Sequence, residues 1–340
     1  MKILLYKGFF RIVSKSGIGE AIRHQEKLFK LLNLTYTKKV NDSFDILQLN
    51  TVFPDSLIIS RWSKWKKKKI IYYAHSTMED FKNSFRGSNW LAPLFKKWII
   101  HCYNSGDIII TPTDYSKKIL KSYGLKKPVF SLSNGIDTDF FCPDIKMGQS
   151  FRIKYQIDPS QKVIISVGHY IERKGILDFI TLAKRMPNYQ FLWFGYTNLN
   201  IVPNNIKKSI QSASTNLRFP GYIDRDELKS AYSGADLFLF VTYEETEGIV
   251  LLEALSSKIP VLIRDISIYR NLLTEGRNVY KAQNLTEFKD KIEKILNNQL
   301  PNLTSAAHEI AAERDLNEVS KQLLNIYTSQ FNNENMQETD

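Results

Sequence analysis

The chain has 340 residues, 43% of them hydrophobic, and a formal net charge of +12. This length exceeds what one hydrophobic core usually holds, so we expect two domains. Its two cysteines, Cys102 and Cys142, are too few for a disulfide framework, and the first residues lack the apolar run of a signal peptide. No run approaches the roughly 18 apolar residues of a spanning helix, so we expect a cytoplasmic protein that is not integral to a membrane.

The positive charge is concentrated in the first half of the chain. Residues 1–143 hold 24 Lys and Arg against 11 Asp and Glu, whereas the remainder holds 23 against 24. Four of the five tryptophans lie in the same basic half: Trp62, Trp65, Trp90 and Trp98. Cationic residues interleaved with amphipathic aromatic side chains favour an anionic partner.

Short runs of β-branched and aromatic residues alternate with segments of helical length. The runs in the first half are residues 2–6, 44–49, 70–74, 107–111 and 128–132. Those in the second half are residues 163–167, 190–194, 235–241 and 260–263. Strands separated by helices imply right-handed β-α-β units, so the pattern predicts an α/β protein with two doubly wound parallel sheets.

The domain boundary is predicted near residues 141–152, where a polar stretch begins. We expect an N-terminal domain over residues 1–145 and a C-terminal domain over residues 152–312. Residues 313–331 have apolar positions at helical spacing, which predicts a last helix that packs back toward the N-terminal domain. Residues 332–340 form a polar tail.

The loops that follow the predicted strands carry the unusual residues. An open α/β sheet binds its ligand at the carboxyl ends of its strands, which makes these loops the expected site. The segments concerned are residues 15–20, 74–76, 133–137, 168–175 and 245–253.

Two of these loops have features that suit a phosphate. Gly17 and Gly19 allow the backbone to approach an anion at a helix N-terminus, although a plain strand-to-helix turn explains them equally well. Arg173 and Lys174 precede Gly175 and would place cations beside such an anion. A Lys/Arg pair in a loop is more often a solvated surface, so the context has to decide.

The segment 245–253 carries the most specific pattern. Glu245 and Glu253 flank Gly248, Ile249 and Val250, which are predicted to open a helix. The carboxylates suit sugar hydroxyls, and the intervening N–H groups suit a diphosphate, so one segment could hold a whole nucleotide sugar. Alternatively, the two glutamates only stabilise the N-terminus of a helix. Because the segment directly follows an apolar strand, we favour the ligand site over this alternative.

These motifs resemble the retaining nucleotide-sugar glycosyltransferases of family 4. The resemblance covers nearly the whole chain and rests on residues 245–254, 168–175, 134–137 with Phe140, and 111–113. Residues 75–81 and 15–20 are most similar to Gram-positive enzymes that add a second hexose to monoglucosyl-diacylglycerol. The implied fold is GT-B, which is two facing Rossmann-like domains with parallel sheets and an interdomain cleft.

The resemblance also implies roles for individual residues. Arg173 and Lys174 would neutralise the donor diphosphate, Glu253 would bind the ribose, and Glu245 would orient the hexose. His75 matches the family's histidine beside the reacting sugar. The donor-binding set is completed by Gly17, Gly19, Gly168, His169, Gly248, Ile249 and Val250. The family usually has Gly-Arg where this chain has Gly168-His169, so His169 or Arg173 would supply part of that contact.

The chemistry implied is transfer with retention from a UDP-hexose. No Asp or Glu stands out as a covalent nucleophile, which favours front-face substitution in which the leaving phosphate helps to deprotonate the incoming hydroxyl. The sequence has no metal-ligand cluster, and the family stabilises the leaving diphosphate with protein cations and helix dipoles. We therefore expect His75, Glu245 and Lys174 to be catalytic and no metal or other cofactor to be required.

Two cationic, amphipathic helices are predicted in the basic half, near residues 54–67 and 89–103. For each helix taken alone, packing of its apolar stripe against the sheet is as good an explanation as membrane binding. Two such helices on one domain favour binding to an anionic membrane surface. The residues expected to contact the membrane are Trp62, Trp65, Lys66, Lys67, Lys68, Lys69, Trp90, Lys96, Lys97 and Trp98.

The first hypothesis is a peripheral enzyme on the inner face of the cell membrane. It would move glucose or galactose from a UDP-sugar to monoglucosyl-diacylglycerol. The second hypothesis is an enzyme that uses the same UDP-sugar donor and transfers the sugar to a cell-wall polymer or polysaccharide precursor. A nucleic-acid-binding protein would explain the charge but none of the strand-end motifs, so we expect no nucleic acid partner.

Overall fold

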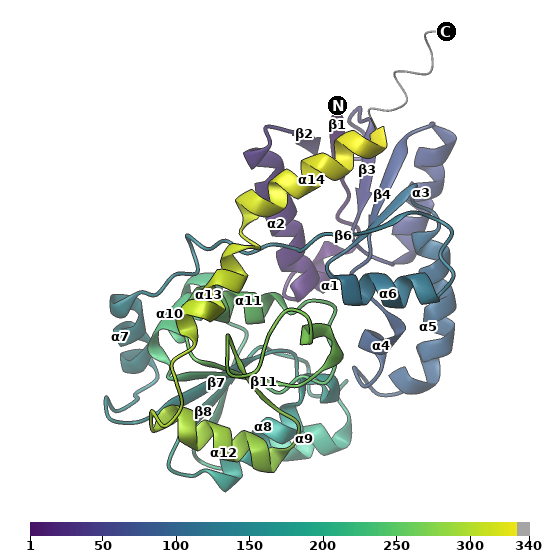
Figure 1. Cartoon of the computed structure of the whole chain (residues 1–340). Helices are drawn as coiled ribbons and strands as arrows, with labels where there is room; N and C mark the ends of the chain where they lie inside the picture. Colours follow the sequence, from purple (N-terminus) through teal and green to yellow (C-terminus); the bar gives the residue numbers. More distant parts are fainter. Residues whose placement is uncertain (332–340) are drawn as a thin grey trace. The chain divides into compact units, whose positions relative to one another are not determined.

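The computed structural model describes residues 1–331, and the chain divides into two compact units. The first unit comprises Met1–Thr77, Pro93–Ile136 and the described residues from Glu313 onward. The second comprises Met78–Ala92 and Asp137–Ala312. Each unit holds one six-stranded sheet in which all pairs are parallel, as the sequence predicts (Figure 1).

The sheet of the first unit has the order β2-β1-β3-β4-β5-β6. Its strands are β1 (Lys2–Leu5), β2 (Thr35–Thr37), β3 (Ile46–Leu49), β4 (Lys69–Tyr73), β5 (Ile108–Thr111) and β6 (Val129–Ser131). Its helices are α1 (Phe10–Val13), α2 (Gly17–Leu31), α3 (Pro54–Trp65), α5 (Ser88–Tyr103, which begins in the second unit), α6 (Asp114–Ser122) and α14 (Leu316–Phe331). The strand order reverses between β1 and β3, which is where such sheets bind ligands.

The sheet of the second unit has the order β12-β11-β10-β7-β8-β9. Its strands are β7 (Val163–Val167), β8 (Gln190–Phe194), β9 (Leu217–Gly221), β10 (Leu237–Phe240), β11 (Val261–Arg264) and β12 (Tyr280–Ala282). Its helices are α4 (Met78–Phe81), α7 (Ile145–Lys154), α8 (Ile176–Arg185), α9 (Asn204–Gln211), α10 (Arg225–Gly234), α11 (Ile249–Ser256), α12 (Leu285–Leu296) and α13 (Thr304–Ala312), with 3-10 turns η1 (Glu172–Lys174) and η2 (Ser267–Tyr269). This is the Rossmann order, with its switch point between β7 and β10.

Each sheet is buried against its own hydrophobic core. In the first unit, Leu316, Val319 and Leu323 of α14 pack in one cluster with strand residues such as Ile3 and Ile71. Figure 1 shows α14 beside α2, which it contacts. The last helix therefore belongs to the first unit because its apolar stripe is buried there.

All nine predicted strands are present, and the three that the pattern missed lie at sheet edges. β2 is an edge strand of the first sheet, and β9 and β12 are the two edges of the second. β2 is three residues long and only partly buried, so it lacks the continuous apolar run of a central strand. An edge strand pairs with a neighbour on one side only and is often short, so its sequence signal is weaker than that of a central strand.

The domain boundaries differ from those expected. Residues 137–145 and 78–92 belong to the second unit, not to an N-terminal domain over 1–145. The carbonyl of Phe141 accepts a hydrogen bond of 2.6 Å from Ser256, and its ring contacts Tyr232, which ties this segment to the second core. The expected linker near 141–152 contains most of α7, which Asp144 caps and which contacts α10. The predicted polar tail, 332–340, lies outside the described residues.

Across residues 1–331, none of the helices has both the length and the apolar character needed to cross a bilayer.

Candidate functional site

The two most informative loops of the sequence meet at one switch point. Residues 168–175 follow β7, and residues 241–248 follow β10, the strand that pairs with β7. Because the chain leaves these adjacent strands in opposite lateral directions, their loops separate and leave room for a ligand. The backbone N–H of Tyr243 donates to the carbonyl of Arg173 over 2.8 Å, so the two loops are also joined to each other.

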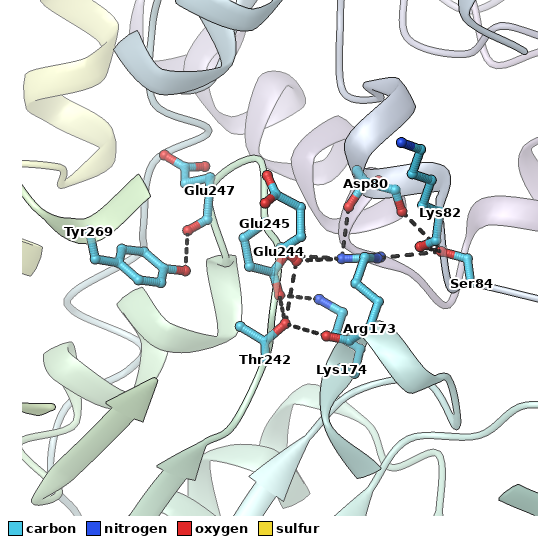
Figure 2. A network of polar contacts seen from close by, with 10 residues as sticks. All are labelled: Asp80, Lys82, Ser84, Arg173, Lys174, Thr242, Glu244, Glu245, Glu247 and Tyr269. Carbon is cyan, nitrogen blue, oxygen red and sulfur yellow. Dashed lines mark hydrogen bonds and ion pairs between the residues drawn. The ribbon is translucent and has the colours of Figure 1, made fainter. Parts of the chain in front are cut away.

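Lys174 and Glu245 form a buried ion pair at this point (Figure 2). Lys174 Nζ donates to Glu245 Oε1, and the hydroxyl of Thr242 donates to the same oxygen over 3.2 Å. Burial lowers the pKa of Lys174, and the charge of Glu245 opposes that effect. A cation held this way is preorganised to meet the charge of a diphosphate.

Arg173 is held by acceptors on three sides. Its Nη1 donates to the carbonyl of Glu244 over 2.7 Å and lies 2.8 Å from Asp80 Oδ1 and 3.8 Å from Glu245 Oε2 (Figure 2). Burial raises the pKa of Asp80, and the charge of Arg173 opposes that effect. Asp80, Arg173, Lys174 and Glu245 thus form a cluster of two cations and two carboxylates.

Gly175 and Gly248 are required by the backbone of this site. Gly175 has a φ of 76°, and a Cβ atom there would lie 2.2 Å from the carbonyl oxygen of Val241. Gly248 has a φ of 88° and precedes α11, and a Cβ atom would lie 2.5 Å from the Tyr269 hydroxyl. That hydroxyl donates to the carbonyl of Glu247 over 2.8 Å, as Figure 2 shows. Larger residues would displace the loops that carry the charged cluster.

The helix predicted after Gly248 is confirmed as α11. It begins at Ile249, with Val250 as its second residue, and the first N–H groups of a helix lack intrahelical acceptors. Glu253 lies one turn further on and is 3% exposed. Its Oε2 accepts a hydrogen bond of 3.0 Å from the Tyr232 hydroxyl. The segment therefore presents free N–H groups and a buried, oriented carboxylate on the same helix.

His169 stands where the family usually has arginine, and it does not replace the charge of that arginine. Its Nδ1–H donates to the carbonyl of Tyr196 over 3.0 Å, and burial lowers its pKa, with Lys174 and Arg173 nearby adding to that effect. A neutral imidazole leaves Arg173 as the second cation of the loop. The carbonyl of Gly168 accepts a hydrogen bond of 2.8 Å from the indole N–H of Trp193.

In the first unit, Gly17 and Gly19 open α2 as predicted, but for different reasons. A Cβ atom at Gly19 would lie 2.5 Å from the carbonyl oxygen of Ser14, so the chain needs glycine there. A Cβ atom at Gly17 would meet nothing within 4 Å. Packing explains Gly19, whereas Gly17 has no packing reason to be glycine.

His75 lies two residues after β4 and is 8% exposed. Its Nε2 lies 2.9 Å from Asn50 Oδ1, and its ring is stacked on Tyr73 with 5.9 Å between ring centroids. Burial lowers the pKa of His75 to about 4, so the imidazole is neutral at neutral pH.

The tryptophans expected at a membrane divide into two classes. Trp65 and Trp90 are 79% and 84% exposed. Trp62 and Trp98 are partly buried, and the indole of Trp98 donates to the carbonyl of Val52 over 2.6 Å. The second pair therefore contacts the protein, and Ile58 on α3 and Leu94 on α5 add to the exposed apolar surface that Trp65 and Trp90 form.

The lysines expected beside them also differ in exposure. Lys66 and Lys67 are exposed at the end of α3, and Lys97 is exposed on α5. Lys68, Lys69 and Lys96 are partly buried. Lys69 begins β4 instead of ending the helix, which stops at Trp65, because Lys67 has a positive φ of 54°.

Sequence reasoning missed three polar residues at these sites. Asp80 and Thr242 contact the charged cluster, and Asn50 contacts His75. Asn50 directly follows β3, so its place at a strand end was a usable signal. Asp80 reaches Arg173 through tertiary packing and had no such signal. Within residues 1–331, no three His, Cys, Asp or Glu side chains are grouped to hold a metal ion.

Comparison with known proteins identifies relatives over most of the chain. Residues 12–140 match the family described as Glycosyltransferase Family 4, and residues 149–314 match Glycosyl transferases group 1. The chain is 39% identical over 329 residues to the processive diacylglycerol alpha-glucosyltransferase of Acholeplasma laidlawii, covering 96% of this chain and 98% of that protein. It is 25% identical to the alpha-galactosylglucosyldiacylglycerol synthase of Streptococcus pneumoniae, covering 79% and 73% of the two chains.

Solved structures share the same fold. HepE from Anabaena in complex with UDP-glucose superposes with a TM-score of 0.74 at 16% identity, covering 97% of this chain and 100% of that one. Sucrose-phosphate synthase from Thermosynechococcus elongatus gives a TM-score of 0.76 at 14% identity, covering 97% and 99%. Together with the full-length relative, these matches show that the chain belongs to glycosyltransferase family 4 and has the GT-B fold.

Proposed function

We propose that the protein transfers glucose or galactose from a UDP-sugar to monoglucosyl-diacylglycerol, with retention of configuration. The observation that carries the proposal is the buried Lys174–Glu245 pair with Arg173 beside it, at the switch point of the second sheet. This arrangement suits a diphosphate with a sugar attached. The names of the two diacylglycerol-linked relatives support a glycolipid acceptor.

The roles proposed for the donor site follow from its geometry. Arg173 and Lys174 balance the charge of the diphosphate, and the first N–H groups of α11 donate to it. Glu253, oriented by Tyr232, accepts from the ribose hydroxyls. Glu245, which contacts both cations, accepts from the hexose hydroxyls, and the roles of Gly17 and His75 rest on the family resemblance of their segments.

The proposed step is a front-face substitution at the anomeric carbon. The bond from that carbon to the diphosphate oxygen breaks as the bond to the acceptor oxygen forms on the same face. The acceptor's proton passes to the departing phosphate, so UDP leaves with the proton and no covalent enzyme intermediate is needed. Arg173 and Lys174 stabilise the charge that develops on the phosphate, and we expect activity to persist in EDTA.

We propose further that the enzyme works on the inner face of the cell membrane as a peripheral protein. The apolar side chains that support this are exposed on α3 and α5: Ile58, Trp65, Trp90 and Leu94. Lys66, Lys67 and Lys97 are exposed on or beside the same helices. Exposed apolar residues flanked by lysines suit an interface rich in anionic lipid.

A second acceptor is favoured by one observation. The relative that is 39% identical is named as processive and as acting on diacylglycerol. Unglycosylated diacylglycerol is therefore the alternative first acceptor, with the monoglucosyl lipid as intermediate.

The test is a transfer assay with each donor and each acceptor in turn. UDP-glucose and UDP-galactose are offered with diacylglycerol, monoglucosyl-diacylglycerol or a polysaccharide primer in mixed vesicles. Product mass identifies the acceptor, and the anomeric proton coupling identifies retention. We expect an α-linked hexose on a diacylglycerol lipid. Transfer only to the polysaccharide primer, or a β-linked product, would contradict the proposal.

A further inference from the structure

A chain of buried polar side chains connects α14 to His75 within the first unit. The hydroxyl of Tyr327 donates to Gln48 Oε1 over 2.5 Å, and Gln48 Nε2 donates to Gln25 Oε1 over 2.7 Å. Gln25 and Asn50 exchange two hydrogen bonds of 2.7 and 2.8 Å. The chain ends where Asn50 Oδ1 meets Nε2 of His75 at 2.9 Å. All five side chains are buried.

The direction of these hydrogen bonds determines which imidazole nitrogen carries the proton. Asn50 Oδ1 can only accept, so Nε2 of His75 must be the protonated nitrogen. A neutral imidazole protonated at Nε2 has an unprotonated Nδ1, which is an acceptor. The reciprocal amide pair couples the orientation of Asn50 to that of Gln25, so Asn50 can turn its amino group toward the ring only if the amides of Gln25 and Gln48 turn with it.

Core filling does not account for this arrangement. Buried amides lose their hydration, and a central parallel strand such as β3 normally buries apolar side chains where it has Gln48. Asn50 and His75 follow the adjacent strands β3 and β4 at their carboxyl ends. The switch point of this sheet lies between β1 and β3, so the polar chain ends at the edge where such sheets bind ligands.

We propose that Asn50, held by Gln25, is a positioning residue that fixes the tautomer of His75. The Nε2-protonated ring then offers Nδ1 as a hydrogen-bond acceptor to a hydroxyl of the substrate. Gln48 and Tyr327 hold Gln25 from the other side, so α14 takes part in orienting the ring. The contact of His75 with substrate rests on the proposed function, whereas the tautomer does not.

The tautomer is measured on the full chain without substrate. Long-range proton–nitrogen correlation spectra of ¹⁵N-histidine-labelled protein report the protonation of each ring nitrogen, and His75→Gln identifies the signals of His75 among those of the five histidines. We expect a protonated Nε2 and an unprotonated Nδ1. In Asn50→Leu, which removes the acceptor, we expect a mixture of tautomers. A wild-type ring protonated at Nδ1, or an Asn50→Leu ring with the wild-type signals, would overturn the inference.

Kinetics test whether the tautomer matters for transfer. Asn50→Leu is expected to lower kcat roughly 10- to 100-fold with little change in the KM for the UDP-sugar, because it misorients one group without removing it. Asn50→Asp keeps an acceptor and adds a negative charge, which favours the imidazolium. The acid limb of the kcat profile should therefore move up by about one pH unit. An unmoved acid limb in Asn50→Asp together with an unchanged kcat in Asn50→Leu would contradict the positioning role.

Ser60→Ala is the matched control. It removes a buried hydrogen bond of 2.8 Å to Ser105 in the same unit and has no contact with the polar chain. We expect wild-type kcat and pH profile from it, so that a general loss of stability is separated from a loss of orientation. If wild type transfers no sugar to a diacylglycerol lipid, the proposed function fails while the tautomer result stands. If Nδ1 carries the proton and transfer persists, the inference alone fails.

Discussion

Arg173 forms an ion pair with Asp80, with 2.8 Å between Nη1 and Oδ1. The guanidinium that we assign to the donor diphosphate is therefore already neutralised by a carboxylate. We predict that Asp80→Asn binds UDP more tightly, by about 5-fold, because the diphosphate no longer competes with a charged side chain. Isothermal titration calorimetry with UDP measures this change.

Glu172→Gln is the control for the Asp80 variant. Glu172 is exposed and adjacent to Arg173 in sequence, so this variant removes one negative charge from the same loop without removing the ion pair. We expect a smaller effect on UDP binding. Weaker binding by Asp80→Asn would instead mean that Asp80 holds Arg173 in the orientation that the donor needs.

Lys174 and Glu245 are expected to be essential for turnover. We predict that Lys174→Ala and Glu245→Gln each lower kcat by roughly 100-fold or more, because each acts on charge or orientation at the donor. Lys174→Ala also leaves the buried Glu245 with only the more distant cation Arg173, which should reduce the free energy of unfolding by about 3 kcal/mol. Circular dichroism checks that the fold is kept, and exposed Lys184→Ala is the control. Near-wild-type transfer in both variants would show that the site is assigned wrongly.

Alanine variants of Gly17 and Gly19 should distinguish a glycine needed for donor binding from one needed for packing. Gly17→Ala meets no atom within 4 Å, so we predict an unchanged melting temperature but weaker donor use as the added methyl group obstructs the diphosphate. Gly19→Ala forces a methyl group to within 2.5 Å of the Ser14 carbonyl oxygen, so we predict a lower melting temperature. Thermal melts and steady-state kinetics on both variants provide the test. Full activity in Gly17→Ala would remove Gly17 from the donor site.

The buried His75 should make the first unit sensitive to acid. Its pKa is lowered from 6.5 to about 4 in the folded state, so between these values the unfolded chain binds more protons. Stability contributed by His75 is complete above about pH 6.5 and falls as the pH drops toward 4, by up to about 3 kcal/mol. Urea titrations across this range in wild type and His75→Gln isolate the effect. We expect a shallower pH dependence in the variant, and equal slopes would contradict the buried neutral ring.

The exposed lysines at the end of α3 should support membrane binding. We predict that replacing Lys66 and Lys67 by Gln weakens binding to vesicles containing phosphatidylglycerol by up to about 2 kcal/mol, with a smaller difference at high salt. Affinity for UDP in solution should not change. Replacing Lys118 and Lys121, which are exposed on α6, is the control for net charge. Equal losses from both pairs would argue against a specific docking surface on α3.

Much of this architecture was predictable from local pattern. Central strands of a parallel sheet are buried on both faces, so runs such as 163–167 and 190–194 coincide with β7 and β8. Parallel strands also bring their carboxyl ends to one edge, which is why the loops at Arg173 and Glu245 could be expected to meet before any contact was known. The three edge strands escaped detection because half-exposed strands have no continuous apolar signal.

The partners of individual side chains depended on packing between distant parts of the chain. Tyr327 donates to Gln48 across 279 positions, and Asp80 reaches Arg173 from a segment expected in the other domain. Trp65 and Trp98 have similar cationic, amphipathic surroundings in sequence, yet Trp65 is exposed and Trp98 donates to the carbonyl of Val52. Periodicity reports whether a residue lies on an apolar face. The atoms opposite that face come from other elements, and no local pattern encodes them.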